Sequence, residues 1–309
     1  MKAIILAQYG GPEQLSLQEV ARPKAGSGQV LVRVVATSLN PIDLKRASGI
    51  MREIFPVEFP FIPGADFSGV VEELGEGAGG FHVGDEVFGV SEDGGTYAEY
   101  LTIDASRIGI KPARLKHAEA ASLALVAQTA AQALESAGVK AGETVLILAA
   151  GGAVGEAAVQ LAHAAGARIL TVSYAESIGR LHSYGADETI DSRKTAFESV
   201  AKDVDAVIDG LGGEWQQRSF GVLKPGGILV ALNQPPSADE AARHHVRAMM
   251  LQTQGSTAQL DALSAKIEAG KLKPFIGRTY ALKDVPQAWM DSRSSHIEGK
   301  IVFQVAAEK

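Results

Sequence analysis

The sequence of 309 residues contains no cysteine. A chain without thiols forms no disulfide, has no cysteine nucleophile and cannot build a zinc site on cysteine. It also has no apolar run approaching the ~20 residues of a membrane-spanning helix. The short apolar stretch at the N-terminus stops at residues 8–12, too soon for a secretory signal. The sequence therefore predicts a cytoplasmic protein that does not enter a membrane.

Positive charge is also in short supply. Lys and Arg number 29 against 36 Asp and Glu, which gives a formal net charge of -7. Because an acidic chain repels a phosphate backbone on average, a dedicated nucleic-acid-binding protein is disfavoured. Apolar residues, in contrast, make up 46% of the chain, enough for a sizeable core, and the length suits two domains of ~100–200 residues.

Glycine and proline divide the chain into two kinds of pattern. In the first third they separate short stretches in which apolar residues alternate, as Val30, Val32 and Val34 do; this predicts antiparallel strands in a barrel-like domain. From residue 118 the pattern becomes an alternation of helices (118–137, 154–165, 177–184, 213–223) and strands (144–148, 168–173, 188–190, 206–209, 227–232). This alternation predicts an α/β fold with a doubly wound parallel sheet, followed by a helix at 258–269 and a buried strand at 301–305.

One loop carries a dinucleotide-binding pattern. The strand at 144–148 runs into Ala149-Ala150-Gly151-Gly152-Ala153-Val154-Gly155, and a helix follows. Gly152 lets the backbone approach a pyrophosphate, Gly155 lets the helix pack close to the strand, and the helix N-terminus presents free N–H groups to the phosphates. We therefore expect the cofactor to contact Ala150, Gly151, Gly152, Ala153 and Val154; the alternative is a tight turn that binds nothing.

The end of the next strand bears on which cofactor binds. Enzymes that use NAD usually place an acid there to hold the ribose 2′-hydroxyl. This strand ends at Ser173, with no carboxylate, and the Ser173 hydroxyl can hydrogen-bond a 2′-phosphate. Arg180 or Arg193 would supply positive charge for that phosphate, unless they are ordinary solvated side chains. The sequence therefore favours NADPH over NADH.

Further motifs appear in a recognisable order along the whole chain. They are Asn40-Pro41-Ile42-Asp43, residues 63–71 (PGADFSGVV), 84–89 (GDEVFG), 95–100 (GTYAEY), Val154-Gly155, 223–227 (LKPGG) and 299–302 (GKIV). With these motifs the chain resembles the medium-chain dehydrogenase/reductase superfamily, and most closely its zinc-less NADPH:quinone oxidoreductase (zeta-crystallin-like) branch. The resemblance implies a GroES-like β-barrel catalytic domain at 1–120, completed by 270–309, and a Rossmann NADPH-binding domain at 121–269.

The zinc-binding residues of this superfamily are missing. Zinc-dependent relatives carry Cys where this chain has Asn40 and His where it has Ala65, so we expect no metal site. Reduction of a simple ketone produces a high-energy alkoxide, which zinc or a strong acid normally stabilises. A quinone or enone instead yields a delocalised anion, so the missing ligands point to conjugated acceptors.

The resemblance also suggests site residues. Asn40 lies in the nicotinamide-side motif, where it would hold a ribose hydroxyl or a substrate oxygen, or else only shape the turn before Pro41. Asp43 and Lys45 follow it as catalytic candidates; Lys45 is either a proton donor or oxyanion partner or a surface lysine. Thr129 matches a threonine that faces the nicotinamide in the family, or simply bonds its own helix backbone.

The remaining cofactor candidates come from strand ends and from the closing motif. Leu211, Gly212, Leu232 and Asn233 follow strands of the parallel sheet, where ligands bind in such folds. Lys300 belongs to the closing family motif, with its role left open.

Taken together, the sequence predicts a zinc-independent oxidoreductase that transfers hydride from NADPH to a quinone or enone. The alternatives are an enoyl-thioester reductase and a NADPH-binding protein without significant turnover. The resemblance also implies a homodimer joined through an edge strand of the Rossmann sheet near residues 227–232, unless that apolar strand is an interior one.

Overall fold

The structure, a computed structural model, describes residues 1–294 and 297–307, and the chain divides into two compact units. The first unit comprises Met1–Leu125, Gly255–Gly270 and Pro274–Lys309, and the second comprises Val126–Gln254 and Lys271–Lys273. The sequence assigns residues up to 269 to the second domain, whereas the structure groups Gly255–Gly270 with the first unit.

The first unit is built on a seven-stranded, mostly antiparallel sheet. Its strands follow the order β14-β15-β3-β4-β5-β7, with β6 paired to β3, and a separate two-stranded sheet joins β1 and β2. The bounds are β1 Lys2–Leu6, β2 Leu15–Glu19, β3 Gln29–Ser38, β4 Asp66–Leu74, β5 Glu86–Val90, β6 Tyr100–Asp104, β7 Ile108–Ile110, β14 Ile276–Ala281 and β15 Lys300–Gln304. The alternation at residues 30–34 is confirmed, because Val30, Val32 and Val34 all enter one core cluster with Phe67.

Three helices belong wholly to the first unit, and one of them explains its boundary. They are α1 Pro41–Ala47, α7 Thr257–Glu268 and α8 Val285–Ser294. The Thr257 hydroxyl of α7 donates to the carbonyl of Ile108 (2.6 Å), and a Cβ at Gly109 would lie 2.8 Å from that of Leu260. Helix α7 is therefore packed directly on β7, which no local sequence pattern reveals.

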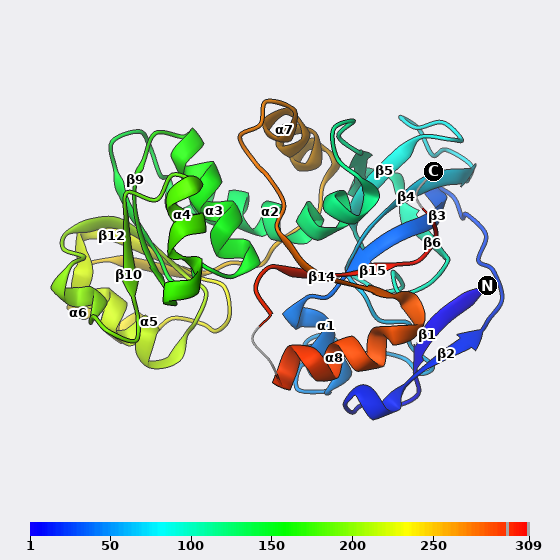
Figure 1. Ribbon diagram of the computed structural model, residues 1–309, viewed down its shortest axis with the longest axis horizontal. Coiled ribbons are helices and arrows are strands. Elements are labelled where there is room, and N and C mark those ends of the chain that lie inside the picture. Colours follow the sequence, from blue (N-terminus) through cyan, green and yellow to red (C-terminus); the bar gives the residue numbers. More distant parts are fainter. Residues whose placement is uncertain (295–296, 308–309) are drawn as a thin grey trace. The chain divides into compact units, whose positions relative to one another are not determined.

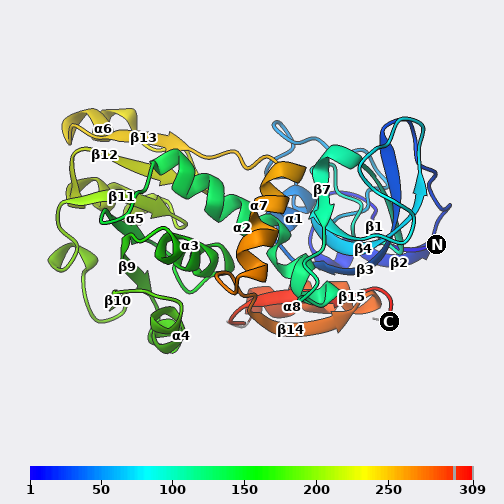
Figure 2. The ribbon, with the colours of Figure 1, turned by 90° about the horizontal axis from the view of Figure 1, so that it is seen from above.

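The second unit contains a six-stranded parallel sheet. The strand order is β10-β9-β8-β11-β12-β13, and every pairing is parallel (Figure 2). The strands are β8 Thr144–Ile147, β9 Arg168–Ser173, β10 Glu188–Asp191, β11 Val204–Asp209, β12 Leu223–Ala231 and β13 Arg247–Met250. The helices are α3 Ala153–Ala164, α4 Ile178–Ser183, α5 Gly213–Ser219 and α6 Ala238–Arg243. Helix α2, His117–Ala137, is shared with the first unit. Counted from β8, this order is 3-2-1-4-5-6, which confirms the prediction of a doubly wound, Rossmann-type sheet.

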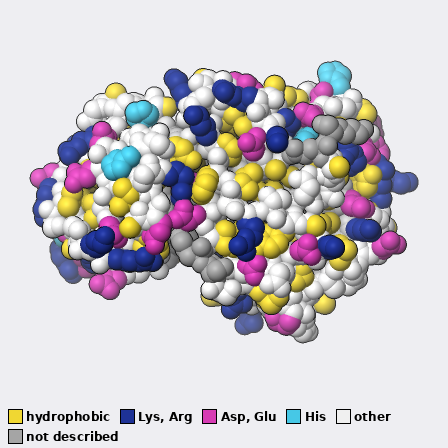
Figure 3. Space-filling view, viewed as in Figure 1, with side chains coloured by type: hydrophobic (Ala, Val, Ile, Leu, Met, Phe, Trp, Pro, Cys, Tyr) yellow, Lys and Arg dark blue, Asp and Glu magenta, His cyan; other side chains and the backbone are white. Residues whose placement is uncertain are grey.

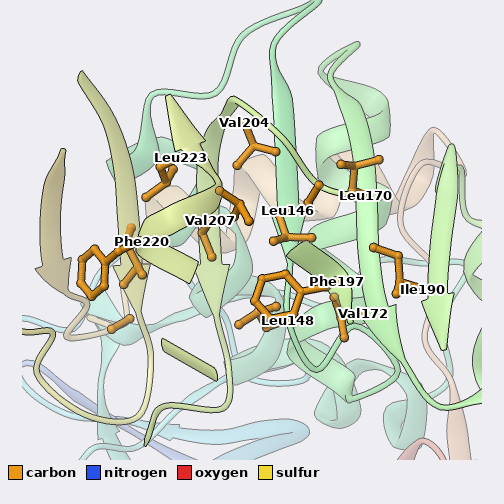
Figure 4. Packing of buried hydrophobic residues seen from close by; sticks show 14 of the residues in the cluster. Leu146, Leu148, Leu170, Val172, Ile190, Phe197, Val204, Val207, Phe220 and Leu223 are labelled. Carbon is orange, nitrogen blue, oxygen red and sulfur yellow. The ribbon is translucent and has the colours of Figure 1, made fainter. Parts of the chain in front are cut away.

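An apolar core lies against this sheet. Leu146 of β8, Leu170 of β9 and Val207 of β11 converge with the rings of Phe197 and Phe220 (Figure 4). All five side chains are at most 3% exposed. Because full burial of such a side chain contributes roughly 1.5–3 kcal/mol, this cluster fixes the strands that end at the nucleotide loop.

The prediction of a sheet edge near residues 227–232 is wrong. Strand β12 pairs with β11 on one side and with β13 on the other, so it is interior. Its run of apolar residues is explained by burial on both sides. On this side of the sheet the edge strand is β13, where Met249 and Met250 are 37% and 39% exposed.

Over the face of the molecule in Figure 3, Lys and Arg side chains are interspersed with Asp and Glu. No helix within the described residues is long and apolar enough to cross a bilayer. In Figure 1 the first unit contains both the N-terminal strands β1 and β2, in blue, and the last strand β15, in red.

Candidate functional site

The loop after β8 lies at the point where the strand order of the second unit reverses, between β9 and β11. In open α/β sheets this carboxyl-terminal edge is where ligands bind. The chain turns sharply there, with Ala149 at φ 54° and the N–H of Gly152 donating to the carbonyl of Ala149 (2.9 Å). The N–H of Ala150 donates to Val172 in β9 (3.0 Å), so the loop is tied to the sheet.

Gly155 is required by packing. A Cβ at this position would lie 2.6 Å from both the oxygen of Ala149 and the Cα of Ala150, closer than any side chain tolerates. Gly152, in contrast, is exposed, so its lack of a Cβ leaves the backbone open to a ligand. The packing role predicted for Gly155 is confirmed, whereas the approach of a pyrophosphate to Gly152 stays a prediction.

Helix α3 begins at Ala153, and no side chain caps it. The first N–H groups of a helix have no partner within the helix and carry the positive end of its dipole. Ala153 and Val154 are partly exposed beside the exposed Gly152. This cradle fits a pyrophosphate, which is the group that the sequence assigns to it.

The strand ends beside this loop are organised by one buried carboxylate. Asp209 accepts the N–H groups of Leu211 and Gly212 (both 2.9 Å) and the Gln216 amide (2.9 Å). Leu211 remains 42% exposed. The sequence names Leu211 and Gly212 but misses Asp209, although an acid at the end of an apolar strand was a usable signal.

The next strand brings the other two predicted residues to the same edge. The N–H of Leu232 donates to the backbone carbonyl of Asp209 (2.9 Å), and the amide of Asn233 donates to the carbonyl of Gly210. Thr129, in α2, shares a hydrogen bond of 3.0 Å with the hydroxyl of Thr253 in the same unit. Thr129 thus has a partner outside its own helix backbone.

Arg180 has an ion-pair partner within the second unit. Its Nε donates to Glu156 at 2.6 Å in a largely buried ion pair that joins α4 to α3. Ser173 is 7% exposed, and its hydroxyl donates to the carbonyl of Tyr174 (3.1 Å). Two exposed cations follow β10 beside this strand end: Arg193, whose guanidinium lies 4.1 Å above the ring of Tyr174, and Lys194, which pairs with Asp191 at 3.4 Å.

In the first unit, Asn40 belongs to a buried polar network. It is 1% exposed; its Nδ2 donates to Asp66 (2.8 Å), and its Oδ1 accepts from Lys300 (2.6 Å). Ser38 donates both its N–H (2.9 Å) and its hydroxyl (2.8 Å) to Asp66. Both ends of the Asn40 amide are therefore used within the protein.

Lys300 is the cation of this network rather than an exposed group. It is 6% exposed, and its ammonium also donates to the carbonyl of Leu39 (2.8 Å) and faces Asp66 at 3.5 Å. With Asn40, these contacts engage the three N–H donors of an ammonium. The network joins the last strand to the segment before α1.

Asp43 is the second buried carboxyl, 4% exposed. It accepts the N–H of Asn40 (2.8 Å) and the hydroxyl of Tyr97 (3.0 Å). Burial, and next the negative charge of Asp66, raise the pKa of Asp43 to about 7. Asp43 is therefore poised between its neutral and charged forms near neutral pH.

Among the three predicted catalytic residues, Lys45 alone is partly exposed. It lies in α1, which Asn40 and Asp43 fix at its N-terminus through a capping box. The buried pair thus holds the helix that carries the lysine.

The residues of the first unit do not suit zinc. A zinc ligand must be an anion or a neutral lone-pair donor, whereas the oxygen of Asn40 already accepts from the ammonium of Lys300, and Ala65 has no ligating atom. Nowhere in the part of the chain that the structure describes do three or more His, Cys, Asp or Glu side chains gather into a metal-binding group.

Two family models match the chain. Residues 26–113 match the alcohol dehydrogenase GroES-like domain, and residues 184–303 match the zinc-binding dehydrogenase family.

Curated relatives and solved structures match it over nearly its whole length. A NADPH-dependent alkenal/one oxidoreductase of Arabidopsis thaliana is 32% identical, covering 98% of this chain and 79% of that protein. A quinone oxidoreductase of Sus scrofa is 34% identical, covering 98% and 97%. The structure of the quinone oxidoreductase from Coxiella burnetii superposes with a TM-score of 0.93 at 35% identity, covering 99% of each chain.

Proposed function

The chain belongs to the medium-chain dehydrogenase/reductase superfamily, in its quinone oxidoreductase branch, and from this premise we propose that it reduces quinones or enones at the expense of NADPH. The observation that carries the proposal is the loop from Ala149 to Gly155. Its packing excludes a side chain at Gly155 while Gly152 stays open. Relatives that match 98% of this chain are named as an alkenal/one oxidoreductase and a quinone oxidoreductase.

The second unit is assigned to the cofactor and the first to catalysis. Gly151, Ala153 and Val154 would hold the pyrophosphate through backbone N–H groups at the start of α3, and Gly152, whose own N–H bonds Ala149, would leave room for it. When bound, NADPH supplies the hydride. The remaining cofactor contacts are assigned to Leu211 and Asn233, which are exposed, to the partly exposed Leu232, and to Ala150, Gly212 and Thr129.

The residues around Asn40 favour a conjugated acceptor. Because this donor set does not fit zinc, the negative charge on the substrate oxygen must be spread by the substrate itself. In a quinone or enone that charge is delocalised, so a single hydrogen-bond donor and a proton suffice. We assign this donor role to Lys45, and to Asn40, Asp43 and Lys300 the positioning of α1.

We also propose a cytoplasmic homodimer joined through β13. Met249 and Met250 are exposed on this edge strand, and an unpaired edge with apolar side chains is a surface that a second copy can extend.

The proposal is tested by following oxidation of NADPH and NADH with a small quinone and a small enone, with and without a chelator. We expect turnover with NADPH that the chelator does not affect. Lys45→Met should lower kcat about 100-fold without changing NADPH affinity, whereas Lys266→Met, at an exposed position in α7, should leave kcat unchanged. NADPH binding without turnover on either acceptor would contradict the proposal, and an unchanged kcat in Lys45→Met would remove the role of that lysine.

A further inference from the structure

The chain that follows α1 in the first unit exposes several large apolar side chains. Ile50 and Ile54 are 79% and 67% exposed, and Phe55 and Phe59 are 41% and 38% exposed. Apolar side chains scattered singly over a surface need no explanation, whereas several along one short stretch mark a binding surface. Residues 50–59, which we call the apolar segment, are therefore a candidate surface for an apolar ligand.

The apolar segment begins with a turn of helical type. The N–H groups of Ile54 (2.9 Å) and Phe55 (2.7 Å) both donate to the carbonyl of Met51. In such a turn, residues four positions apart lie on the same side. Ile50 and Ile54 therefore present their side chains side by side.

Tyr9 holds the apolar segment at both ends. A Cβ at Gly49 would lie 2.9 Å from the ring of Tyr9, so the chain before Ile50 runs close against this ring. The hydroxyl of Tyr9 accepts the N–H of Val57 (3.4 Å), and the ring of Phe59 meets that of Tyr9 edge to face at 4.8 Å. These contacts fix the backbone while Ile50 and Ile54 stay in solvent.

A cavity of about 540 Å³ opens at the start of the apolar segment, lined by Ser48, Gly49, Ile50, Arg52 and Glu53. Its volume lies in the range of ligand sites, roughly 300–1,000 Å³. Arg52 and Glu53 pair with each other at 3.4 Å, so the charges of the lining compensate. A phosphate or carboxylate would need an excess of cations there, and the lining therefore suits an uncharged group.

The apolar segment is continuous with the helix that carries Lys45. The N–H of Ser48 donates to the carbonyl of Leu44 (3.0 Å), and its hydroxyl donates to that of Lys45 (3.0 Å). At the ~1.5 Å rise per residue of a helical turn, Ile50 follows Lys45 by roughly 8 Å along the chain. A substituent of a few carbons on an acceptor held by Lys45 spans this length.

We propose that Ile50 and Ile54, with Phe55, bind an apolar substituent of the acceptor, so that the enzyme favours quinones or enones carrying an alkyl or prenyl chain. This inference rests on the proposed function and deepens it by naming the acceptor class and the residues that select it. The driving force is the removal of both apolar surfaces from water.

The test compares 2-methyl-1,4-benzoquinone with 2-pentyl-1,4-benzoquinone as acceptors in the oxidation of NADPH. Each ring carries one alkyl group, so the two quinones differ in chain length and hardly in reactivity. We would measure kcat/KM for both with the wild type, the double variant Ile50→Asn/Ile54→Asn and Val83→Asn. Val83 is the matched control, because it lies in the same unit and is 65% exposed, against 67% for Ile54.

For the wild type we expect kcat/KM to be about 10- to 20-fold higher with the pentyl than with the methyl quinone, since each half-buried methylene contributes about twofold. In the double variant this ratio should fall to about threefold or less, whereas Val83→Asn should keep the wild-type ratio. Because the ratio is taken within one variant, a loss of folded protein or of NADPH affinity cancels.

The outcomes separate the inference from the proposed function. Equal kcat/KM for both quinones in the wild type, or an unchanged ratio in the double variant, overturns the inference and leaves the proposed function standing. No turnover of either quinone overturns both.

Two further measurements identify a different occupant. If the wild type sediments with phosphatidylcholine vesicles and the double variant does not, a lipid surface covers the apolar segment. If the double variant alone has a lower mass in sedimentation velocity, a second copy of the chain covers it. Either result overturns the inference.

Discussion

At the scale of single residues, the first unit buries two carboxylates with one ammonium. Asp43, Asp66 and Lys300 are all less than 7% exposed, and Asn40 lies between them. Removing one partner from such a network leaves a buried charge, which typically costs ~3–5 kcal/mol. A second negative charge in this buried site is unfavourable, and burial together with the charge of Asp66 therefore raises the pKa of Asp43 to about 7.

This shift predicts how stability depends on pH. In the unfolded chain Asp43 loses its proton near its ordinary pKa of 3.8, whereas in the folded protein it keeps the proton up to about 7. The unfolded state therefore binds fewer protons in this window, so the contribution of Asp43 to stability is full below pH 3.8 and is lost as the pH rises to about 7.

Asp43→Asn should remove this loss. The free energy of unfolding of the variant, relative to the wild type, should rise with pH between about 4 and 7, by at most about 1.4 kcal/mol per pH unit, and level off above. Urea unfolding at several pH values measures it, and Asp261→Asn, at an exposed carboxylate of α7, controls for the loss of one charge. A difference that is independent of pH would contradict the assignment.

At the scale of elements, the turn from β8 to α3 is where local pattern and packing agree. Its backbone is fixed by the bond from Ala150 to Val172 and by the close approach of Gly155 to Ala149 and Ala150. Glycine at 155 is thus a requirement of packing, and it lets α3 begin directly against the end of β8.

Gly155→Ala should therefore destabilise the protein and loosen cofactor binding. The added Cβ meets backbone atoms at 2.6 Å, so the helix start must shift, at a cost of about 1–3 kcal/mol. Gly179→Ala is the matched control: it lies in α4 with nothing within 4 Å of its Cβ, and alanine in a helix should stabilise by about 0.4–1 kcal/mol. Thermal unfolding and NADPH titration measure both variants; equal effects would refute the packing argument.

At the scale of the whole molecule, the parallel sheet leaves two edges, β10 and β13, and the methionines mark β13 as the one suited to a second copy. The double variant Met249→Glu/Met250→Glu should convert the dimer to monomers, because a two-fold axis brings each new charge close to its equivalent in the partner. Sedimentation velocity measures the mass. Met290→Glu, at a methionine of α8 that is 47% exposed, is the control and should remain dimeric. A monomeric wild type would contradict the proposal.

The sequence by itself determined the features that depend on neighbours in the chain. Alternation at Val30, Val32 and Val34 indicated strands, and the order of strand, glycine loop and helix around Gly152 and Gly155 indicated the nucleotide site. These succeed because the periodicity of a strand and the geometry of a turn are set by a few consecutive residues. Family motifs extended the prediction to the fold class and the cofactor.

Only the tertiary structure decided which side chains meet across long separations. Lys300 donates to Asn40, which is 260 positions away in the sequence, and Arg180 forms an ion pair with Glu156. Strand β13 rather than β12 forms this edge of the parallel sheet. No local pattern encodes these choices, because a charged side chain looks alike in sequence whether it is solvated or buried against a partner. The different burial of the Arg180 and Arg193 ion pairs, 16% against 60% exposed at the arginine, arises only when the strands and helices of the second unit are brought together.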